Sequence, residues 1–345
     1  MEISKLNYLG NLNKNQKEAI IDIDGPCLIV AGAGSGKTRV LTSRVVHIIN
    51  EKKAWPSQIL CVTFTNKAAK EMQNRIANFL KKKQTSIPWL GTFHSVSAKL
   101  LRKHAEAVGL NSRFTIIDQE DQLRLIKNIC KAEKIDVKKV APQFILSFIN
   151  QWKNKGLLPK DVITKRGIPL ERAILNVYKF YQERLKILNS CDFGDLILLC
   201  VAMFENNPDI LELYLNNFKY ILVDEYQDSN YIQSKWLNLL AKKNNNICCV
   251  GDDDQSIYSW RGAEIRNFLD FSKTYKNTKI IKLEQNYRST QNILSAASGL
   301  IAKNTDRLGK KLWTDSKDGY PVKLTCYKNG REEAIGVCDI IEKKL

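Results

Sequence analysis

A glycine-rich segment near the start of the chain has the residue types and order that suit phosphate binding. It reads Ala31-Gly32-Ala33-Gly34-Ser35-Gly36-Lys37-Thr38, with Arg39 next. An apolar run precedes it and apolar residues at helical spacing follow it, so the segment is predicted to be the turn between a strand and a helix. Glycines allow backbone N–H groups to point inward at a phosphate chain, and the start of the helix adds its positive end.

Two side chains of this segment favour a nucleotide with Mg²⁺. Lys37 can reach the β and γ phosphates, and the Thr38 hydroxyl can bind the metal ion. The pattern usually opens with glycine, and the small Ala31 is sufficient at that position. The loop alone fits a kinase, a GTPase, a transporter motor or a helicase, so the rest of the chain must distinguish these classes.

Carboxylates suited to phosphoryl transfer follow a second apolar strand. Residues 220–223 are apolar, and Asp224 and Glu225 come directly after them. One carboxylate can hold Mg²⁺ while the other polarises or deprotonates the attacking water. A further apolar strand, at 247–250, leads to Gln255, which we expect close to the γ phosphate.

Aromatic and basic residues follow Gln255 within six positions. Tyr258, Trp260 and Arg261 are suited to single-stranded nucleic acid, because each base offers a face for stacking, worth about 1–3 kcal/mol per base. One loop that serves both a nucleotide and a nucleic acid suggests a coupler between ATP and DNA. A small-molecule kinase would not explain these residues.

Two other predicted strands end in residues that could bind the same ligand. Phe64 follows the apolar residues 59–62, at the sheet edge where α/β proteins bind ligands, although a place in the core is the favoured interpretation of this residue alone. Thr92, His94 and Ser95 could contact a backbone phosphate, ahead of a helix expected from 96 to about 108.

Polar residues near both ends of the chain could complete the nucleotide site. The Gln16 amide could pair with an adenine edge, whereas a plain amphipathic helix is the alternative interpretation of its segment. Arg288 could place a guanidinium on a phosphate, and Tyr287 could stack on a base.

The composition indicates a globular protein with an anionic partner. The chain has 345 residues with 44% hydrophobic content, which predicts two or three domains. Its formal charge of +18 favours a nucleic acid, although a general enrichment in lysine is an alternative explanation. The nine cysteines contain no C-x-x-C pair and are expected to be buried thiols. Without a long apolar run or a signal-peptide core, we expect a cytoplasmic protein with no membrane partner.

The predicted elements change character along the chain. Between 115 and 190 the pattern is helical, and this part has 15 basic and 8 acidic residues, a net charge of +7. It is interpreted as a basic helical insertion in an α/β domain. After 290 we expect a helix to about 303, a strand near 322–327 and a helix from 331, the start of another α/β unit.

In this order the motifs resemble those of the UvrD/Rep/PcrA family of superfamily 1 DNA helicases. The resemblance covers nearly the whole chain. The matching strings are AGAGSGKT at 31–38, VTFTNKAAKEM at 62–72, GTFHS at 91–95, DFGDL at 192–196, VDEYQD at 223–228, GDDDQSIYSWRGA at 251–263 and QNYRST at 285–290, with Gln16 upstream.

The resemblance implies a fold and a division into domains. A RecA-like P-loop motor domain with a parallel sheet would comprise 1–114 and 190–284. The all-helical subdomain at 115–189 would interrupt it, and 285–345 would begin a second, incomplete RecA-like domain. Family members run to roughly twice this length, so we expect the later motifs to lie beyond the sequence.

The resemblance also implies roles for single residues. ATP would bind between the two motor domains, with Gln16 and Tyr287 at the adenine. Asp224 and Thr38 would hold Mg²⁺, Glu225 would be the catalytic base, and Gln255 and Arg288 would act on the γ phosphate. The residues expected to contact DNA are Phe64, Thr92, His94, Tyr258, Trp260 and Arg261.

The implied activity is ATP-dependent translocation from 3′ to 5′ on single-stranded DNA and unwinding at single-strand to duplex junctions. Repair or replication proteins would be the partners. The alternative is a truncated module that binds ATP and single-stranded DNA without unwinding on its own.

Overall fold

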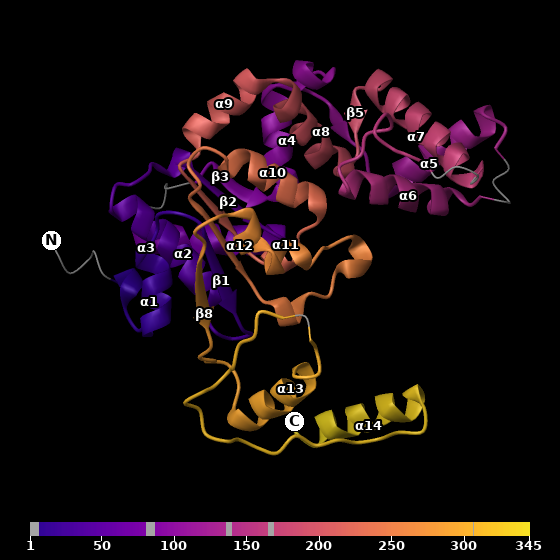
Figure 1. Cartoon of the computed structure of the whole chain (residues 1–345). Helices are drawn as coiled ribbons and strands as arrows, with labels where there is room; N and C mark the ends of the chain where they lie inside the picture. The colour runs from indigo at the N-terminus through magenta and orange to yellow at the C-terminus, as the bar shows by residue number, and fades with distance from the viewer. Residues whose placement is uncertain (1–6, 81–86, 136–139, 165–168, 306) are drawn as a thin grey trace.

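A six-stranded parallel sheet forms the centre of the computed structural model, which describes residues 7–80, 87–135, 140–164, 169–305 and 307–345 (Figure 1). The strand order is β3-β2-β6-β7-β1-β8, and every pair in it is parallel. The strands are β1 Cys27–Ala31, β2 Ile59–Thr63, β3 Trp89–Thr92, β6 Tyr220–Val223, β7 Ile247–Gly251 and β8 Lys279–Leu283. The predicted α/β fold with a parallel sheet is therefore confirmed.

Helices cover both faces of the sheet, which explains why its inner strands are apolar throughout. In β1, Leu28 and Val30 belong to one hydrophobic core, whereas Ile29 and Ala31 belong to the other. One face is covered by α1 Lys14–Ile21, α2 Lys37–Asn50 and α3 Asn66–Leu80. The other is covered by α4 Phe93–Lys103, α8 Phe193–Asn206, α9 Pro208–Asn217, α10 Tyr231–Ala241, α11 Arg266–Leu269 and α12 Phe271–Thr274.

Three helices form a separate body beside the sheet, at the upper right of Figure 1. They are α5 Gln119–Ala132, α6 Pro142–Asn154 and α7 Pro169–Ile187, and they share a third hydrophobic core. The chain enters and leaves this body through two short parallel strands, β4 Thr115–Ile116 and β5 Ser190–Cys191.

A buried polar cluster joins the helical body to the sheet domain. Nζ of Lys153, on α6, lies 2.6 Å from Oδ2 of Asp192 and 2.7 Å from Oδ1 of Asp195, at the start of α8. The hydroxyl of Tyr181 donates to the same Asp192 oxygen at 2.8 Å. Asp192 and Asp195 also form the capping box of α8. Because these charged groups are buried, each is stabilised only while its partners of opposite charge are present.

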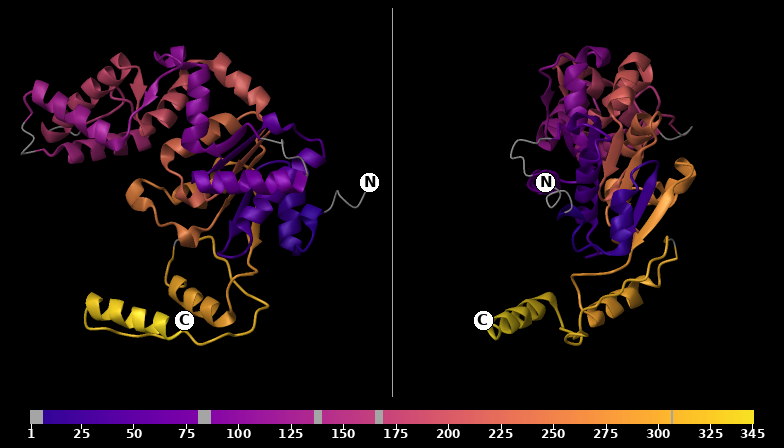
Figure 2. Two further views of the ribbon diagram at one scale, coloured as in Figure 1. Left: turned by 180° about the vertical axis from the view of Figure 1, so that it is seen from behind. Right: turned by 90° about the vertical axis from the view of Figure 1, so that its left-hand side faces the viewer.

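The last part of the chain lies below the sheet and contains α13 Gln291–Ile301 and α14 Gly330–Glu342 (Figures 1 and 2). The prediction of a strand near 322–327 is wrong. These residues are exposed, and no strand within the described ranges pairs with them, so their backbone groups lack the ladder that defines a strand.

The helix predicted from 96 to about 108 has other bounds in the structure. It begins at Phe93, because Oγ1 of Thr92 accepts a hydrogen bond from the Ser95 N–H, and it ends at Lys103, before a separate 3-10 turn at Ala105–Val108. No helix within the described ranges is both long and apolar enough to span a membrane.

Candidate functional site

The glycine-rich loop connects β1 to α2, as the sequence predicts. Gly34 and Gly36 have φ values of 69° and 88°, a left-handed conformation that favours glycine, and α2 begins at Lys37 directly afterwards. A Cβ atom on Gly34 would lie 2.7 Å from Cβ of Arg288. Glycine therefore allows both the turn and the close approach of the segment that carries Arg288.

Lys37 meets the predicted carboxylates at the end of β6. Its Nζ atom lies 3.2 Å from Oε2 of Glu225. Glu225 has a φ of 50°, which is uncommon for a residue with a side chain and typical of functional turns. Burial, with a smaller contribution from Glu225, raises the pKa of Asp224 to about 7, and Lys37 acts in the opposite direction.

The donors predicted for Mg²⁺ fit that ion in their chemistry. Thr38 lies in the first turn of α2, and Asp224 follows β6. Both offer oxygen atoms, which Mg²⁺ prefers. Asp224 is buried, so a cation would stabilise its charged form. These two residues would hold the ion, whose charge would support binding of the phosphates.

Gln227, which the sequence interpretation did not single out, connects this site to β7. Its Nε2 donates to Oε2 of Glu225 at 2.9 Å, and its Oε1 accepts from the Asp252 N–H at 3.0 Å. The side chain of Gln255 in turn donates to Oδ2 of Asp252. Gln255 is thus linked to Glu225 through two intermediate residues. The only signal for Gln227 in the sequence was its place in the string VDEYQD.

The segment after β8 packs on the glycine-rich loop. Nδ2 of Asn286 donates to the Ala33 carbonyl at 2.6 Å, and the Tyr287 N–H donates to the Gly34 carbonyl at 3.0 Å. Oδ1 of Asn286 accepts from the N–H groups of Arg288 and Ser289. Asn286 was not predicted as a site residue, yet it holds the backbone of Arg288, which was.

The predicted adenine residues lie near each other but already have partners within the chain. Nε2 of Gln16 donates to the Ser35 carbonyl at 2.9 Å, and its Oε1 accepts from the Asn13 N–H at 3.1 Å. The Tyr287 hydroxyl accepts from Nδ2 of Asn13 at 2.9 Å. Gln16 therefore supports the glycine-rich loop and keeps one amide hydrogen for another partner.

The remaining predicted loop residues have structural contacts. Ala31 is the buried last residue of β1, and the Gly32 N–H donates to the Leu283 carbonyl of β8 at 3.3 Å. Oγ of Ser35 donates to the Gly32 carbonyl at 2.7 Å. Arg39 points to the N-terminal segment, where its guanidinium donates to the Gly10 carbonyl at 2.6 Å.

Four of the six predicted nucleic-acid residues form an aromatic cluster in and beside the loop that follows Gln255. The rings of Phe64 and Tyr258 stack with centroids 5.2 Å apart, and Trp260 lies 6.3 Å from Tyr258. The Arg261 guanidinium lies over the rings of Tyr258 and Trp260, at 5.7 and 5.4 Å. Phe64 is half-buried and touches this cluster, which favours a ligand role over the core role.

A second aromatic pair lies at the starts of α4 and α8. His94 and the exposed ring of Phe193 make an edge contact at 6.0 Å. Burial lowers the pKa of His94, which favours the neutral form of its ring. Thr92 instead caps α4. The sequence interpretation noted the string DFGDL but did not single out Phe193. The structure shows that this phenylalanine is exposed and lies beside His94, a predicted ligand residue.

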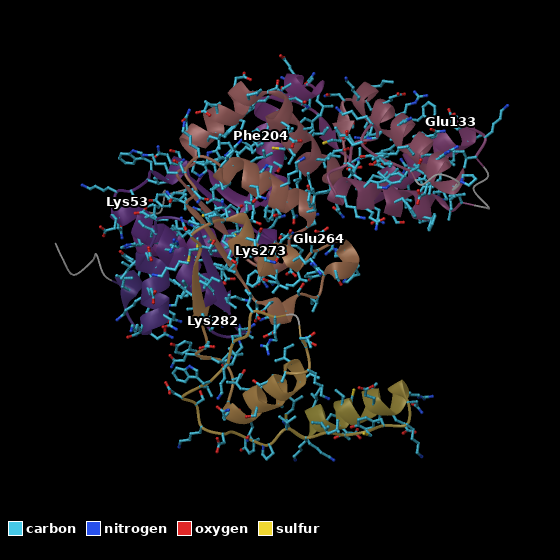
Figure 3. All side chains as sticks on the ribbon, viewed as in Figure 1. Lys53, Glu133, Phe204, Glu264, Lys273 and Lys282 are labelled. Carbon is cyan, nitrogen blue, oxygen red and sulfur yellow. The ribbon has the colours of Figure 1, made fainter. Side chains whose placement is uncertain are left out.

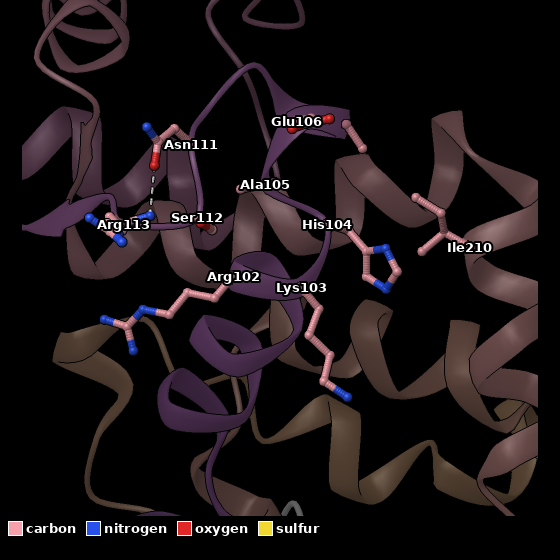
Figure 4. Close-up of a pocket in the computed structure, with 10 residues that line it drawn as sticks. Arg102, Lys103, His104, Ala105, Glu106, Asn111, Ser112, Arg113 and Ile210 are labelled. Carbon is pink, nitrogen blue, oxygen red and sulfur yellow. Dashed lines mark hydrogen bonds between the residues drawn. The ribbon is translucent and has the colours of Figure 1, made fainter.

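A large open hollow lies apart from these residues (Figure 4). It has a volume of about 710 Å³ and lies where the end of α4 leads toward β4. Its charged lining is mainly basic, with Arg102, Lys103 and Arg113 against Glu106. None of the predicted site residues lines it, so this hollow is distinct from the nucleotide and nucleic-acid candidates.

Two families of protein domains match the chain. The UvrD/REP helicase N-terminal domain matches residues 12–276, and the UvrD-like helicase C-terminal domain matches residues 281–345.

Curated relatives are similar over nearly the whole chain. A probable DNA helicase II homolog of Rickettsia felis is 48% identical over 99% of this chain and 52% of the relative. ATP-dependent DNA helicase PcrA of Staphylococcus epidermidis is 45% identical over 94% of this chain and 44% of the relative, and PcrA of Bacillus subtilis is 44% identical over 95% and 44%. The chain spans about half the length of the curated relatives it matches.

Proposed function

Because the chain belongs to the UvrD/REP helicase family, we propose that it is the ATP-binding part of a DNA helicase that couples ATP hydrolysis to 3′-to-5′ movement along single-stranded DNA. Lys37, Thr38 and the glycine-rich loop bind the phosphates and Mg²⁺, with Asp224 as the second metal ligand. Glu225 is the catalytic base, and Gln255 and Arg288 contact the γ phosphate. Gln16 and Tyr287 lie at the adenine.

DNA binds across the aromatic cluster. Phe64, Tyr258 and Trp260 stack on bases, Arg261 and His94 assist, and Phe193 extends the surface. The motor domain comprises 1–114 and 190–284, the helical subdomain 115–189, and the second motor domain begins at 285. Junctions of single-stranded and duplex DNA are the substrates, repair or replication proteins are the partners, and the location is cytoplasmic.

One observation carries this proposal. Residues 252–261 form a single short connection that begins with Asp252, hydrogen-bonded to Gln227 and through it linked to Glu225, and ends in the Tyr258, Trp260 and Arg261 cluster. A change at the γ phosphate and a change at a stacked base would therefore bias the same loop, as coupling between two ligands requires.

The test is ATP hydrolysis by the chain with and without a single-stranded oligonucleotide. We expect DNA to stimulate hydrolysis, Lys37→Ala to abolish it, and Lys242→Ala, at an exposed lysine after α10, to leave it unchanged. Binding of ATP and DNA without turnover would identify a binding module instead. A rate of ATP hydrolysis that is the same with and without DNA would contradict the coupling.

Direction and unwinding need a separate measurement. If the chain unwinds duplexes that carry a 3′ or a 5′ single-stranded tail, only the 3′-tailed form should be unwound, whereas DNA binding without any unwinding would support the truncated module. Equal unwinding of both, or unwinding of the 5′-tailed form alone, would contradict the proposed direction.

A further inference from the structure

Three consecutive aspartates follow β7, and one lysine from the last part of the chain lies among them. Nζ of Lys310 lies 2.7 Å from Oδ1 of Asp252, 2.5 Å from Oδ1 of Asp253 and 2.6 Å from Oδ2 of Asp254. Arg307 adds a second cation, 2.7 Å from Oδ2 of Asp254. A lysine 56 to 58 positions further along the chain, together with Arg307, thus offsets two of the three negative charges of this acidic turn.

Burial makes the lysine essential to the charge balance of the turn. The side chain of Lys310 is 1% exposed, and those of Asp252 and Asp253 are 2% and 0% exposed. Buried carboxylates this close to one another repel strongly unless a cation lies between them. Burial opposes the charge on Lys310, but the three carboxylates outweigh it and raise the pKa of Lys310 above its ordinary value.

Asp252 transmits this contact to the predicted γ-phosphate residue. One of its carboxylate oxygens, Oδ1, contacts Lys310, and the other, Oδ2, accepts from the side chain of Gln255. Its backbone N–H donates to Gln227, which contacts Glu225. The orientation of the Asp252 carboxylate therefore determines where the Gln255 amide is held.

The loop that carries Lys310 is held in place by several hydrogen bonds. The Leu308 N–H donates to Oδ2 of Asp253 at 2.8 Å, and Nζ of Lys282 donates to the Leu308 carbonyl at 3.2 Å. Lys282, labelled in Figure 3, is on β8, where the sheet leads into the last part of the chain. Residue 313 then pairs with residues 284 to 286, next to the segment on the glycine-rich loop.

We propose that Lys310 is a positioning residue for Gln255. By fixing Asp252, it holds the Gln255 amide in place and makes γ-phosphate contact depend on the docking of residues 307–313. When this loop moves away, the three carboxylates repel one another and Gln255 loses its fixed partner. Lys310 does not touch the nucleotide. The inference rests on the proposed function, since Gln255 acts in ATP hydrolysis there.

The test compares Lys310→Ala with Lys310→Arg and with Lys311→Ala. Lys311 is the matched control, because its side chain is exposed and its backbone N–H bond to Glu284 survives the substitution. Two quantities are measured: hydrogen exchange of the backbone amides of 252–256, and the separate values of kcat and KM for ATP with saturating oligonucleotide.

In Lys310→Ala we expect exchange at 252–256 to accelerate at least about tenfold, with exchange in α10 unchanged. We expect kcat to fall at least about tenfold while KM stays within about threefold, because the glycine-rich loop and Lys37 remain. Lys310→Arg, which keeps the charge, should recover part of both losses. Lys311→Ala should behave as wild type.

The inference would be overturned if the amides of 252–256 exchanged in Lys310→Ala at the same rate as in the wild type. It would also be overturned if the substitution raised KM for ATP by the same factor by which it lowered kcat. If Lys310→Ala fails to fold, Lys310→Met with Asp253→Asn removes one charge of each sign and is measured in its place. If the wild-type chain does not hydrolyse ATP, the proposed function fails, and the exchange measurement alone decides whether Lys310 orders the loop of Gln255.

Discussion

Nζ of Lys37 and Oε2 of Glu225 lie 3.2 Å apart, across 188 residues of sequence. The contact joins the glycine-rich loop to the end of β6 and brings a cation to the edge of a carboxylate pair. Asp224, the other member of that pair, is buried and has a raised pKa, so the pair is sensitive to charge from Lys37, from Mg²⁺ and from protons.

Stability should depend on pH through Asp224. Its pKa of about 7 in the folded chain exceeds the ordinary value of 3.8, so the folded state binds more protons between these values. The unfolding free energy should therefore decline as pH rises from about 4 to about 7 and then level off. Asp224→Asn should remove the contribution of Asp224 to this decline, while Asp228 and Asp195, whose pKa values are raised to about 6, still contribute between about pH 4 and 6. The variant should be more stable than wild type at pH 8, by an amount on the order of a few kcal/mol.

The measurement is urea unfolding from pH 4.5 to 8 with a chelator and without nucleotide. Parallel pH curves for wild type and Asp224→Asn would show that Asp224 ionises normally.

Gly34→Ala should separate backbone strain from the docking of the QNYRST segment. Both Gly34 and Gly25 have positive φ, but a Cβ on Gly25 meets nothing within 4 Å, whereas on Gly34 it lies 2.7 Å from Arg288 and 2.8 Å from Asn286. Each substitution should destabilise the chain by about 1–2 kcal/mol through its left-handed backbone. Only Gly34→Ala should also weaken nucleotide binding, by at least about tenfold, or about 1.4 kcal/mol.

Fluorescent nucleotide titration of both variants checks this. Equal nucleotide affinity in Gly34→Ala and Gly25→Ala would show that the docking of Asn286 and Arg288 does not contribute to the site.

Trp260→Ala should weaken DNA binding and spare nucleotide binding. Its side chain is 77% exposed, so stability should change by no more than about 0.5 kcal/mol. Loss of one stacked base should reduce the affinity for a single-stranded oligonucleotide by about 1–3 kcal/mol and reduce DNA-stimulated hydrolysis with it.

Trp55 is the matched control, since it is 75% exposed and lies outside the aromatic cluster. Anisotropy with a labelled oligonucleotide should show Trp55→Ala binding like wild type. An equal loss of nucleotide and DNA affinity in Trp260→Ala would count against its assigned role.

Lys153→Met should destabilise the connection between the helical body and the sheet domain. It would leave two carboxylates, Asp192 and Asp195, buried without their cation, which typically costs about 3–5 kcal/mol. Lys243→Met removes a lysine from an exposed pair with Glu212 and should cost about 0–1 kcal/mol. Urea unfolding followed by circular dichroism measures both, and similar midpoints for the two variants would contradict a structural role for the buried cluster.

Local sequence patterns were sufficient for the sheet and for the ligand-bearing ends of its strands. Apolar runs marked β1, β2, β6 and β7, because strands covered on both faces carry little else. Gly34, Gly36 and Lys37 followed from the phosphate-loop pattern, and the pair at 224 and 225 followed from its place after an apolar strand. The same logic failed at 322–327, because a short apolar run predicts a strand only where a neighbour can pair with it.

Contacts between distant parts of the chain could not be predicted in this way. Asn286 bonds to Ala33 and Lys310 to Asp252, and neither spacing leaves a periodic signal in one sequence. Gln227 was part of a noted string, but one of its two partners, Asp252, lies 25 residues further along the chain, after β7. Phe193 was hidden by an apolar helix, whose pattern does not show that its first residue is exposed.

The paired strands β4 and β5 make the helical body exchangeable. Thr115 pairs with Ser190 and Ile116 with Cys191, so the chain departs from the sheet domain and returns to it at neighbouring points. Closing a loop between such points depends only weakly on the length of the loop. A helical body of another size could therefore be grafted between residues 116 and 190 without changing the order of the sheet, provided that it supplies a lysine where Lys153 now meets Asp192 and Asp195.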